Sequence, residues 1–259
     1  MKRRGVFGPA SAGSILALLA SAVGALHAAA GGLERQVRVN PDAVPWRAVG
    51  KLQAVSANFR ETCTATLIGP TLVLSAAHCL VNPRTGRFFP PSAVHFLIGY
   101  AGERYAGHAI GRSVTIGTGY DPARPTETIG SDWTLIRLDK ALGAADRVLP
   151  MLRDPLPTGA AVMLGGYERD HPLVPIADTQ CRILGRAIDA NGRALLRHSC
   201  VSLPGISGAP LLVDVGGAWH VAAVAVAEEP GAAGNLAALP DPTGALRIGV
   251  AGTAAMESK

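Results

Sequence analysis

Residues 71–80 read TLVLSAAHCL, a short apolar run that ends in His78 and is followed at once by Cys79. The run has the length and the Val, Leu and Thr content of a β-strand, and it stops at small residues that suit a turn. Similar runs bounded by glycine and proline recur along the chain: CTATLIG, AVHFLIG, WTLIRL, AAVMLGG, APLLVDV and HVAAVAVA. No long helical period follows the N-terminal 30 residues, so the sequence predicts an all-β protein built as a sandwich or a pair of barrels.

The composition narrows the class of protein. The chain has 259 residues, of which 48% are hydrophobic and 17% are charged, which is enough apolar material for a core and too little charge for a disordered protein. The net charge of +5 comes mostly from scattered arginines, without a block of like charges that would indicate nucleic-acid binding. The composition therefore predicts a globular protein of one or two domains.

The N-terminus has the features of an export signal. It begins MKRRG, continues as an apolar run rich in alanine and leucine, and ends in small residues that suit cleavage near Ala28 or Ala30. An uncleaved membrane anchor is the alternative, but the apolar core is short and broken by glycine, and no later segment is long enough to span a membrane. We expect a secreted or periplasmic protein with no membrane contact after cleavage.

The strand count suits two halves that join near residues 143–157. The predicted organisation has four parts: a signal peptide (1–30), an N-terminal segment or short pro-segment (31–45), an N-terminal β-barrel (46–145) and a C-terminal β-barrel (146–259).

His78 and Cys79 mark the first candidate site. Cys63 lies sixteen residues earlier, at the start of the preceding predicted strand, so an antiparallel hairpin can bring the two sulfurs within bonding range. Such a disulfide would restrain the turn that carries the imidazole of His78. A metal site is the alternative, but adjacent His and Cys ligands are awkward and no paired C-x-x-C spacing exists, so we expect neither a metal nor a cofactor. With four cysteines in an exported chain, two disulfides are expected.

Two further residues, Asp132 and Ser207, become candidate catalytic residues only in combination with His78. Asp132 opens the apolar run WTLIRL, although a turn aspartate before a strand is also common. Ser207 lies in PGISGAP, where Gly205 and Gly208 suit either a simple turn or a loop whose Gly205 and Ser207 N–H groups form an oxyanion hole. An α/β-hydrolase would require the order Ser, acid, His, and a subtilisin would place the acid first and need helices. The order His78, Asp132, Ser207 is the one found on paired β-barrels.

These motifs resemble those of the trypsin-like serine peptidases of the chymotrypsin fold. LSAAHC resembles the family's T-A-A-H-C, SDWTLIRL its D-x-x-L-I-x-L, and GISGAPL its G-D-S-G-G-P-L. VPWRAVGKL, CTATLIGPTLVLSAAHC, GY and HSCVSLPGISGAP resemble the glutamyl-endopeptidase-like branch of secreted bacterial members. The resemblance covers roughly Arg38 to Val250. It implies two six-stranded antiparallel β-barrels and a secreted serine endopeptidase that acts on proteins or peptides, expected as a monomer.

The resemblance also implies roles for individual residues. Ser207 would be the nucleophile, His78 the general base, and Asp132 the carboxylate that orients the imidazole. Gly205 and Ser207 would supply the oxyanion-hole N–H groups. Cys63 would pair with Cys79, and Cys181 with Cys200.

Two departures from the family's pattern concern activation and specificity. Ile206 stands where zymogen-activated members have an aspartate that pairs with a new N-terminal amine, so activation by that ion pair is unavailable.

The substrate pocket is expected at five residues: Val201, Ser202, Ala225, Val226 and Ala227. Because these are small or apolar, we expect a preference for small or medium apolar side chains, unless Glu228 or Glu229 reaches into the pocket. An inactive binding module on the same fold and an esterase using the same triad are the alternative functions.

Overall fold

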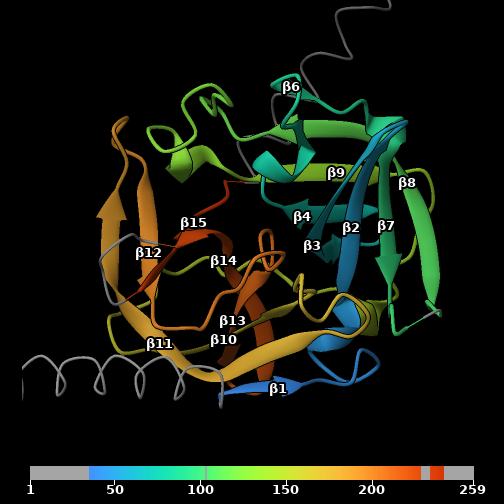
Figure 1. Ribbon diagram of the computed structural model, residues 1–259. Coiled ribbons are helices and arrows are strands. Elements are labelled where there is room, and N and C mark those ends of the chain that lie inside the picture. The colour runs from blue at the N-terminus through green and yellow to red at the C-terminus, as the bar shows by residue number, and fades with distance from the viewer. Residues whose placement is uncertain (1–34, 103, 229–233, 242–259) are drawn as a thin grey trace, which may run out of the picture. The chain divides into compact units, whose positions relative to one another are not determined.

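Two antiparallel β-barrels contain nearly all of the described strands (Figure 1). The computed structural model describes residues 35–102, 104–228 and 234–241, so the predicted signal peptide lies outside the described residues. Within these ranges there is no α-helix, only single turns of 3-10 helix. No helix in the described part of the chain is long and apolar enough to cross a membrane. The predicted all-β, two-barrel fold is confirmed.

The first barrel is formed by six strands that lie within residues 49–138. Their order around the barrel is β2-β3-β4-β9-β8-β7, and pairing of β2 with β7 closes the ring. The strands are β2 (Val49–Ser56), β3 (Phe59–Gly69), β4 (Leu72–Ser75), β7 (Val94–Ile98), β8 (Gly107–Ile116) and β9 (Thr134–Leu138). Side chains of β7 alternate between buried and half-buried, so Val94, Phe96 and Ile98 point into the core. The Phe96 ring fills the space that a side chain at Gly50 would need, which explains a glycine inside β2.

The second barrel uses six strands within residues 161–238. Their order is β11-β10-β13-β14-β15-β12, and the additional β11–β12 pairing closes the ring. The strands are β10 (Ala161–Gly166), β11 (Ile176–Ile188), β12 (Ala194–His198), β13 (Pro210–Val215), β14 (Ala218–Glu228) and β15 (Asn235–Ala238). A further strand, β1 (Gln36–Arg38), comes from the segment before the first barrel and pairs with β11. The N-terminal segment therefore contributes to the second barrel rather than to the first.

Short elements complete the described chain. They are a two-stranded sheet of β5 (Val81–Asn82) with β6 (Arg87–Phe88), and the 3-10 turns η1 (Trp46–Ala48), η2 (His78–Leu80), η3 (Pro91–Ala93), η4 (Ile129–Ser131) and η5 (Ala145–Arg147). The turn η5 lies in the connection between the barrels.

The two barrels meet around Thr64, a fully buried residue of β3. Its backbone N–H donates to the carbonyl of Ser207 at 2.9 Å, and its hydroxyl accepts from the N–H of Tyr167 at 2.8 Å. Its carbonyl accepts from the hydroxyl of Ser75 at 2.7 Å. One small polar residue of the first barrel therefore fixes the positions of two segments from the second.

Both expected disulfides, Cys63–Cys79 and Cys181–Cys200, are present. The second ties β11 to the segment that leads into the Ser207 loop, and both of its cysteines lie in the apolar core of the second barrel. It thus restrains one wall of that loop.

Replacing Cys181 and Cys200 together by alanine should lower the free energy of unfolding by about 2–4 kcal/mol, because the unfolded chain gains the freedom that the bridge removes. Urea denaturation of the oxidised protein and the variant measures this difference. An unchanged midpoint would show that the bridge does not contribute to stability.

Candidate active site

The imidazole of His78 and the carboxylate of Asp132 are brought together by two adjacent strands of the first barrel. His78 begins η2 just after β4, and Asp132 lies just before β9, with Ser75 paired to Thr134 across the two strands. The Nδ1 atom of His78 lies 2.6 Å from Oδ2 of Asp132, and the backbone N–H of His78 donates to Oδ1 at 2.8 Å. Asp132 is only 4% exposed. Both carboxylate oxygens are thus occupied by one residue, which holds the ring in one orientation.

This geometry determines which nitrogen of the ring is available. A carboxylate oxygen facing Nδ1 requires the proton on Nδ1, so Nε2 is left to accept a proton. Burial by itself lowers the pKa of His78, but the charge of Asp132, its hydrogen bond and, more weakly, the charge of Glu61 outweigh burial and raise the pKa above 6.5. The side chain remains 32% exposed, so a reactant can reach Nε2. The pair has the arrangement of a general base with its orienting carboxylate.

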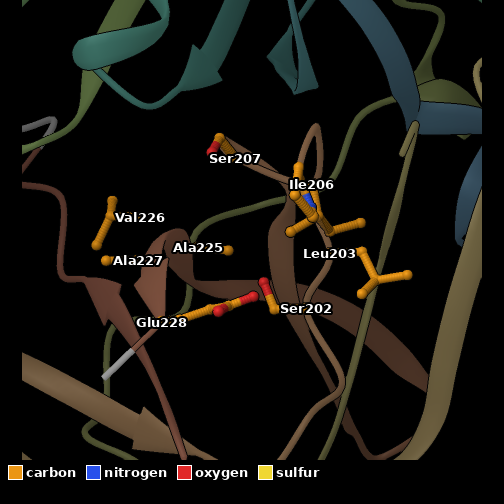
Figure 2. Close-up of a pocket in the computed structure, with 9 residues that line it drawn as sticks. Ser202, Leu203, Ile206, Ser207, Ala225, Val226, Ala227 and Glu228 are labelled. Carbon is orange, nitrogen blue, oxygen red and sulfur yellow. The ribbon is translucent and has the colours of Figure 1, made fainter. Parts of the chain in front are cut away.

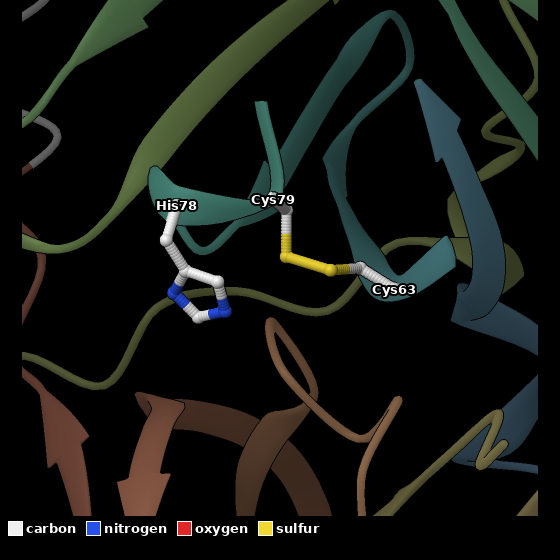
Figure 3. A group of neighbouring side chains, drawn as sticks. All are labelled: Cys63, His78 and Cys79. Atoms are coloured by element: carbon white, nitrogen blue, oxygen red, sulfur yellow. A yellow bond between two sulfur atoms is a disulfide. The ribbon is translucent and has the colours of Figure 1, made fainter. Parts of the chain in front are cut away.

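The Cys63–Cys79 disulfide lies directly beside His78 (Figure 3). In the described residues, these three side chains form the only group of His, Cys and acidic residues close enough to share a metal ion, with ligand atoms within 4.8 Å of one another. Because the two sulfurs are bonded to each other, neither is a thiolate ligand. The bridge instead fixes the η2 turn against β3, in keeping with its predicted structural role.

Ser207 is partly exposed and is carried to the same place by the loop before β13. The chain at Gly208 passes so close to Ser75, Ala76 and Thr64 that no side chain fits, and its φ of +79° also favours glycine. Its N–H donates to the carbonyl of Ala225 at 2.8 Å. Ser75 and Ala76 immediately precede the turn that bears His78, so the loop brings Ser207 to the His78 turn.

Gly205 and Ser207 supply two backbone N–H groups that have no protein acceptor within the described residues. Gly205 has a φ of +101°, and a β-carbon there would lie 2.8 Å from the backbone N of Arg169 and 2.9 Å from the carbonyl oxygen of Tyr167. Glycine is therefore required on both conformational and steric grounds. The two free donors are what an oxyanion hole needs.

Ile206 is buried beside the Cys181–Cys200 bridge, next to which the sequence predicts that packing organises the loop. Its side chain is 4% exposed and belongs to the apolar core of the second barrel, together with both cysteines of the Cys181–Cys200 bridge. Its N–H donates to Leu203 at 3.1 Å, and its carbonyl accepts from Ala209 at 2.9 Å. Apolar packing and local hydrogen bonds thus anchor the loop at the position before Ser207.

A cavity of about 290 Å³ opens next to Ser207 (Figure 2). It is lined by Ser202, Leu203, Pro204, Ile206 and Ser207 of the loop and by Ala225, Val226, Ala227 and Glu228 of β14. Four of the five expected pocket residues therefore line it. Val201 does not, because its backbone is held elsewhere: its N–H donates to Oδ2 of the buried Asp178 at 2.9 Å.

Glu228, which the sequence places in the pocket only if its side chain reaches in, does line the cavity. Figure 2 shows its carboxylate beside the Ser202 side chain, at the end of the cavity away from Ser207. No lining residue is cationic, and Glu228 forms no ion pair within the described part of the chain. Glu229 lies outside the described residues.

His198, at the end of β12, lies outside the cavity lining. It is fully buried, and neither ring nitrogen has a hydrogen-bond partner among the described residues. Burial lowers the pKa of His198 to about 4, although the charge of Asp178 opposes this shift. It is a neutral core residue at physiological pH.

A family model described as Trypsin matches residues 35–238. The chain belongs to the trypsin family. Among curated proteins, this trypsin-family chain is 25% identical over 211 residues to transmembrane protease serine 5 of Homo sapiens. The match covers 72% of this chain and 44% of that protein's length.

Two solved structures share the trypsin-family fold. A Glu endopeptidase superposes with a TM-score of 0.66 at 17% identity, covering 83% of this chain and 95% of that one. The protease Anisep from Arthrobacter nicotinovorans superposes with a TM-score of 0.64 at 12% identity, covering 83% and 99%. These likenesses support the trypsin-like, two-barrel fold predicted from the motifs.

The pKa of His78 should lie above 6.5 in the native protein and fall below that value in the Asp132→Asn variant. Without the carboxylate charge, burial is opposed only by the weaker effect of Glu61. NMR titration of the His78 ring protons measures both values. Equal pKa values in the two proteins would contradict the electrostatic role given to Asp132.

Proposed function

We propose that the protein is a serine endopeptidase that uses Ser207 as nucleophile, His78 as general base and then acid, and Asp132 as the orienting carboxylate. The observation that carries the proposal is the two-point contact of the buried Asp132 with His78, at 2.6 and 2.8 Å. A carboxylate placed in this way fixes the tautomer needed for base catalysis and stabilises the imidazolium that forms. The partly exposed side chain of His78 and the loop that carries Ser207 complete the arrangement.

The reaction would follow acyl-enzyme chemistry. The Oγ atom of Ser207 attacks the carbonyl carbon of the scissile bond while its proton passes to Nε2 of His78. The N–H groups of Gly205 and Ser207 stabilise the oxyanion, each contributing about 3–4 kcal/mol. The imidazolium then protonates the leaving amine, and water, activated by the same base, releases the acyl group.

We further propose that the pocket accepts a basic side chain, Arg or Lys, on the residue before the scissile bond. Among the described residues, the carboxylate of Glu228 is the only charged group in the lining, and it lies beside Ser202 at the end of the cavity away from Ser207. A cationic side chain entering past Ala225 and Val226 would end against this carboxylate. This proposal replaces the preference for apolar side chains that the residue types alone predict.

The N-terminal sequence and the two disulfides support a proposal for the cellular location of the protein. We propose export, with residues 1–30 removed as a signal peptide, and a monomer that acts on protein or peptide substrates without nucleic acid or cofactor. Two disulfides suit an oxidising compartment. Whether residues 31–45 are trimmed is open to N-terminal sequencing of the exported protein.

A fluorophosphonate probe should label the native protein at Ser207, because the probe reacts with an activated serine. Labelling should vanish in Ser207→Ala and slow by at least about a thousandfold in His78→Ala, since base and nucleophile act as one unit. Ser113→Ala, at an exposed serine of β8, is the matched control and should label normally. Absence of labelling in the native protein would favour a binding module, and hydrolysis of esters without cleavage of peptides would favour an esterase.

Glu228→Gln should lower kcat/KM for substrates cleaved after Arg or Lys by about tenfold to a hundredfold, the loss of one charge-assisted contact. Cleavage after Ala or Leu should be unaffected. A panel of peptides that differ only at this position measures the change. Glu127→Gln removes an exposed carboxylate elsewhere and serves as control. A native preference for Ala or Leu would contradict the role of Glu228.

A further inference from the structure

The oxyanion loop rests against a second segment, residues 167–171, which connects β10 to β11. The N–H of Arg169 donates to the carbonyl of Pro204 at 2.6 Å, next to Gly205. The backbone of residues 167–169 also lies so close to Gly205 that a β-carbon there would approach it to within 3.1 Å or less. Tyr167 is fully buried, and its hydroxyl donates to the carbonyl of Tyr100 at 2.8 Å. The conformation at Gly205 thus depends on where residues 167–169 are held.

Glu168, in the middle of this segment, has a buried carboxylate. The residue is 2% exposed, and burial raises the pKa of its carboxyl group. One oxygen accepts from Nε2 of Gln36 at 2.6 Å. The other has no hydrogen-bond partner within the described residues, and Nδ1 of His171 lies 3.8 Å from it. Because a buried carboxylate needs compensating contacts, the hydrogen bond from Gln36 matters for the position of Glu168.

Gln36 comes from a distant part of the chain. It begins β1, whose three residues pair with Ile176–Asp178 at the edge of the second barrel, and it lies 132 residues before Glu168. The next contact of this segment is the hydrogen bond from the N–H of Val39 to Pro175 at 3.1 Å. A strand this short has few bonds of its own, so its side-chain contact with Glu168 couples the N-terminal strand to residues 167–171.

We infer that Gln36 is a positioning residue for the oxyanion hole: by holding the carboxylate of Glu168, it fixes the 167–169 backbone and, through it, the N–H of Gly205. This inference rests on the proposed peptidase function. It assigns the task of ordering the loop to a hydrogen bond from the amide of Gln36 in the N-terminal strand. Ile206 has no charge with which to form an ion pair, and it is buried among apolar side chains.

The first experiment compares Gln36→Ala with Gln180→Ala, both made in the full-length chain and purified after export. Gln180 is an exposed residue of β11 and serves as the matched control. Gln36→Ala should lower kcat by about tenfold while KM stays within about twofold, because an oxyanion hole acts on the transition state and not on the bound substrate. Glu168→Gln, which retains an amide oxygen as acceptor, should keep more activity than Glu168→Ala. An unchanged kcat in Gln36→Ala would overturn the inference.

A second experiment reads the same coupling without catalysis. In the Ser207→Ala background, hydrogen exchange at the N–H groups of Arg169, Ile206 and Gly208 should be faster with Gln36→Ala than with Gln180→Ala. If exchange is faster with Gln36→Ala but the probe fails to label the native protein, which retains Ser207, the coupling is retained and the peptidase is rejected. If exchange is unchanged and the native protein is labelled normally, the coupling is rejected and the peptidase is retained.

Discussion

The hydrogen bonds of the buried Thr64 hold the two barrels in register. The proposed nucleophile lies on one barrel and the base on the other, so their relative position is set by contacts between the barrels. Thr64, one residue from the disulfide beside His78, bonds Ser207 through its N–H, Tyr167 through its hydroxyl and Ser75 through its carbonyl. Because the residue is fully buried, each of these groups would be costly to leave unpaired. The barrels are therefore joined in one arrangement, at the site where alignment is needed.

Two buried carboxylates near the site are compensated in different ways. Asp132 receives two N–H groups from a single residue, and its charge raises the pKa of His78. Glu168 receives one amide hydrogen bond, from Gln36, and its own pKa is raised by burial. The first arrangement suits a charge that must persist while the imidazole becomes protonated. The second arrangement suits a carboxylate with a positioning role. In the proposed coupling, the hydrogen bond from Gln36 holds Glu168 and so sets the position of the backbone at residues 167–169.

The loop around Ser207 relies on steric restriction more than on charge. Gly205 and Gly208 occupy left-handed conformations against backbone that leaves no space for side chains, and Ile206 is buried in the second barrel's core. The Cys181–Cys200 bridge packs in the same core. The neutral interior contrasts with the cavity, where Glu228 is the one charged lining residue in the part of the chain that the structure describes. In the proposed function, this charge favours binding of a cationic side chain.

The amino-acid sequence alone predicts seven of the twelve barrel strands, β3, β4, β7, β9, β10, β13 and β14, from apolar runs bounded by turn residues. It also shows the order His78, Asp132, Ser207, and hairpin proximity indicates the Cys63–Cys79 pairing. It also indicated two closed barrels, since the motifs resemble a family with that fold. Three features become visible only in the folded chain: Val201 bonds to Asp178 outside the cavity, Glu228 lines the cavity, and Gln36 contacts Glu168. These outcomes depend on where β1, β11 and β14 lie relative to the loop. Contacts between residues as far apart as Gln36 and Glu168 leave no periodic signal in the chain, because they arise from packing in three dimensions rather than from local spacing.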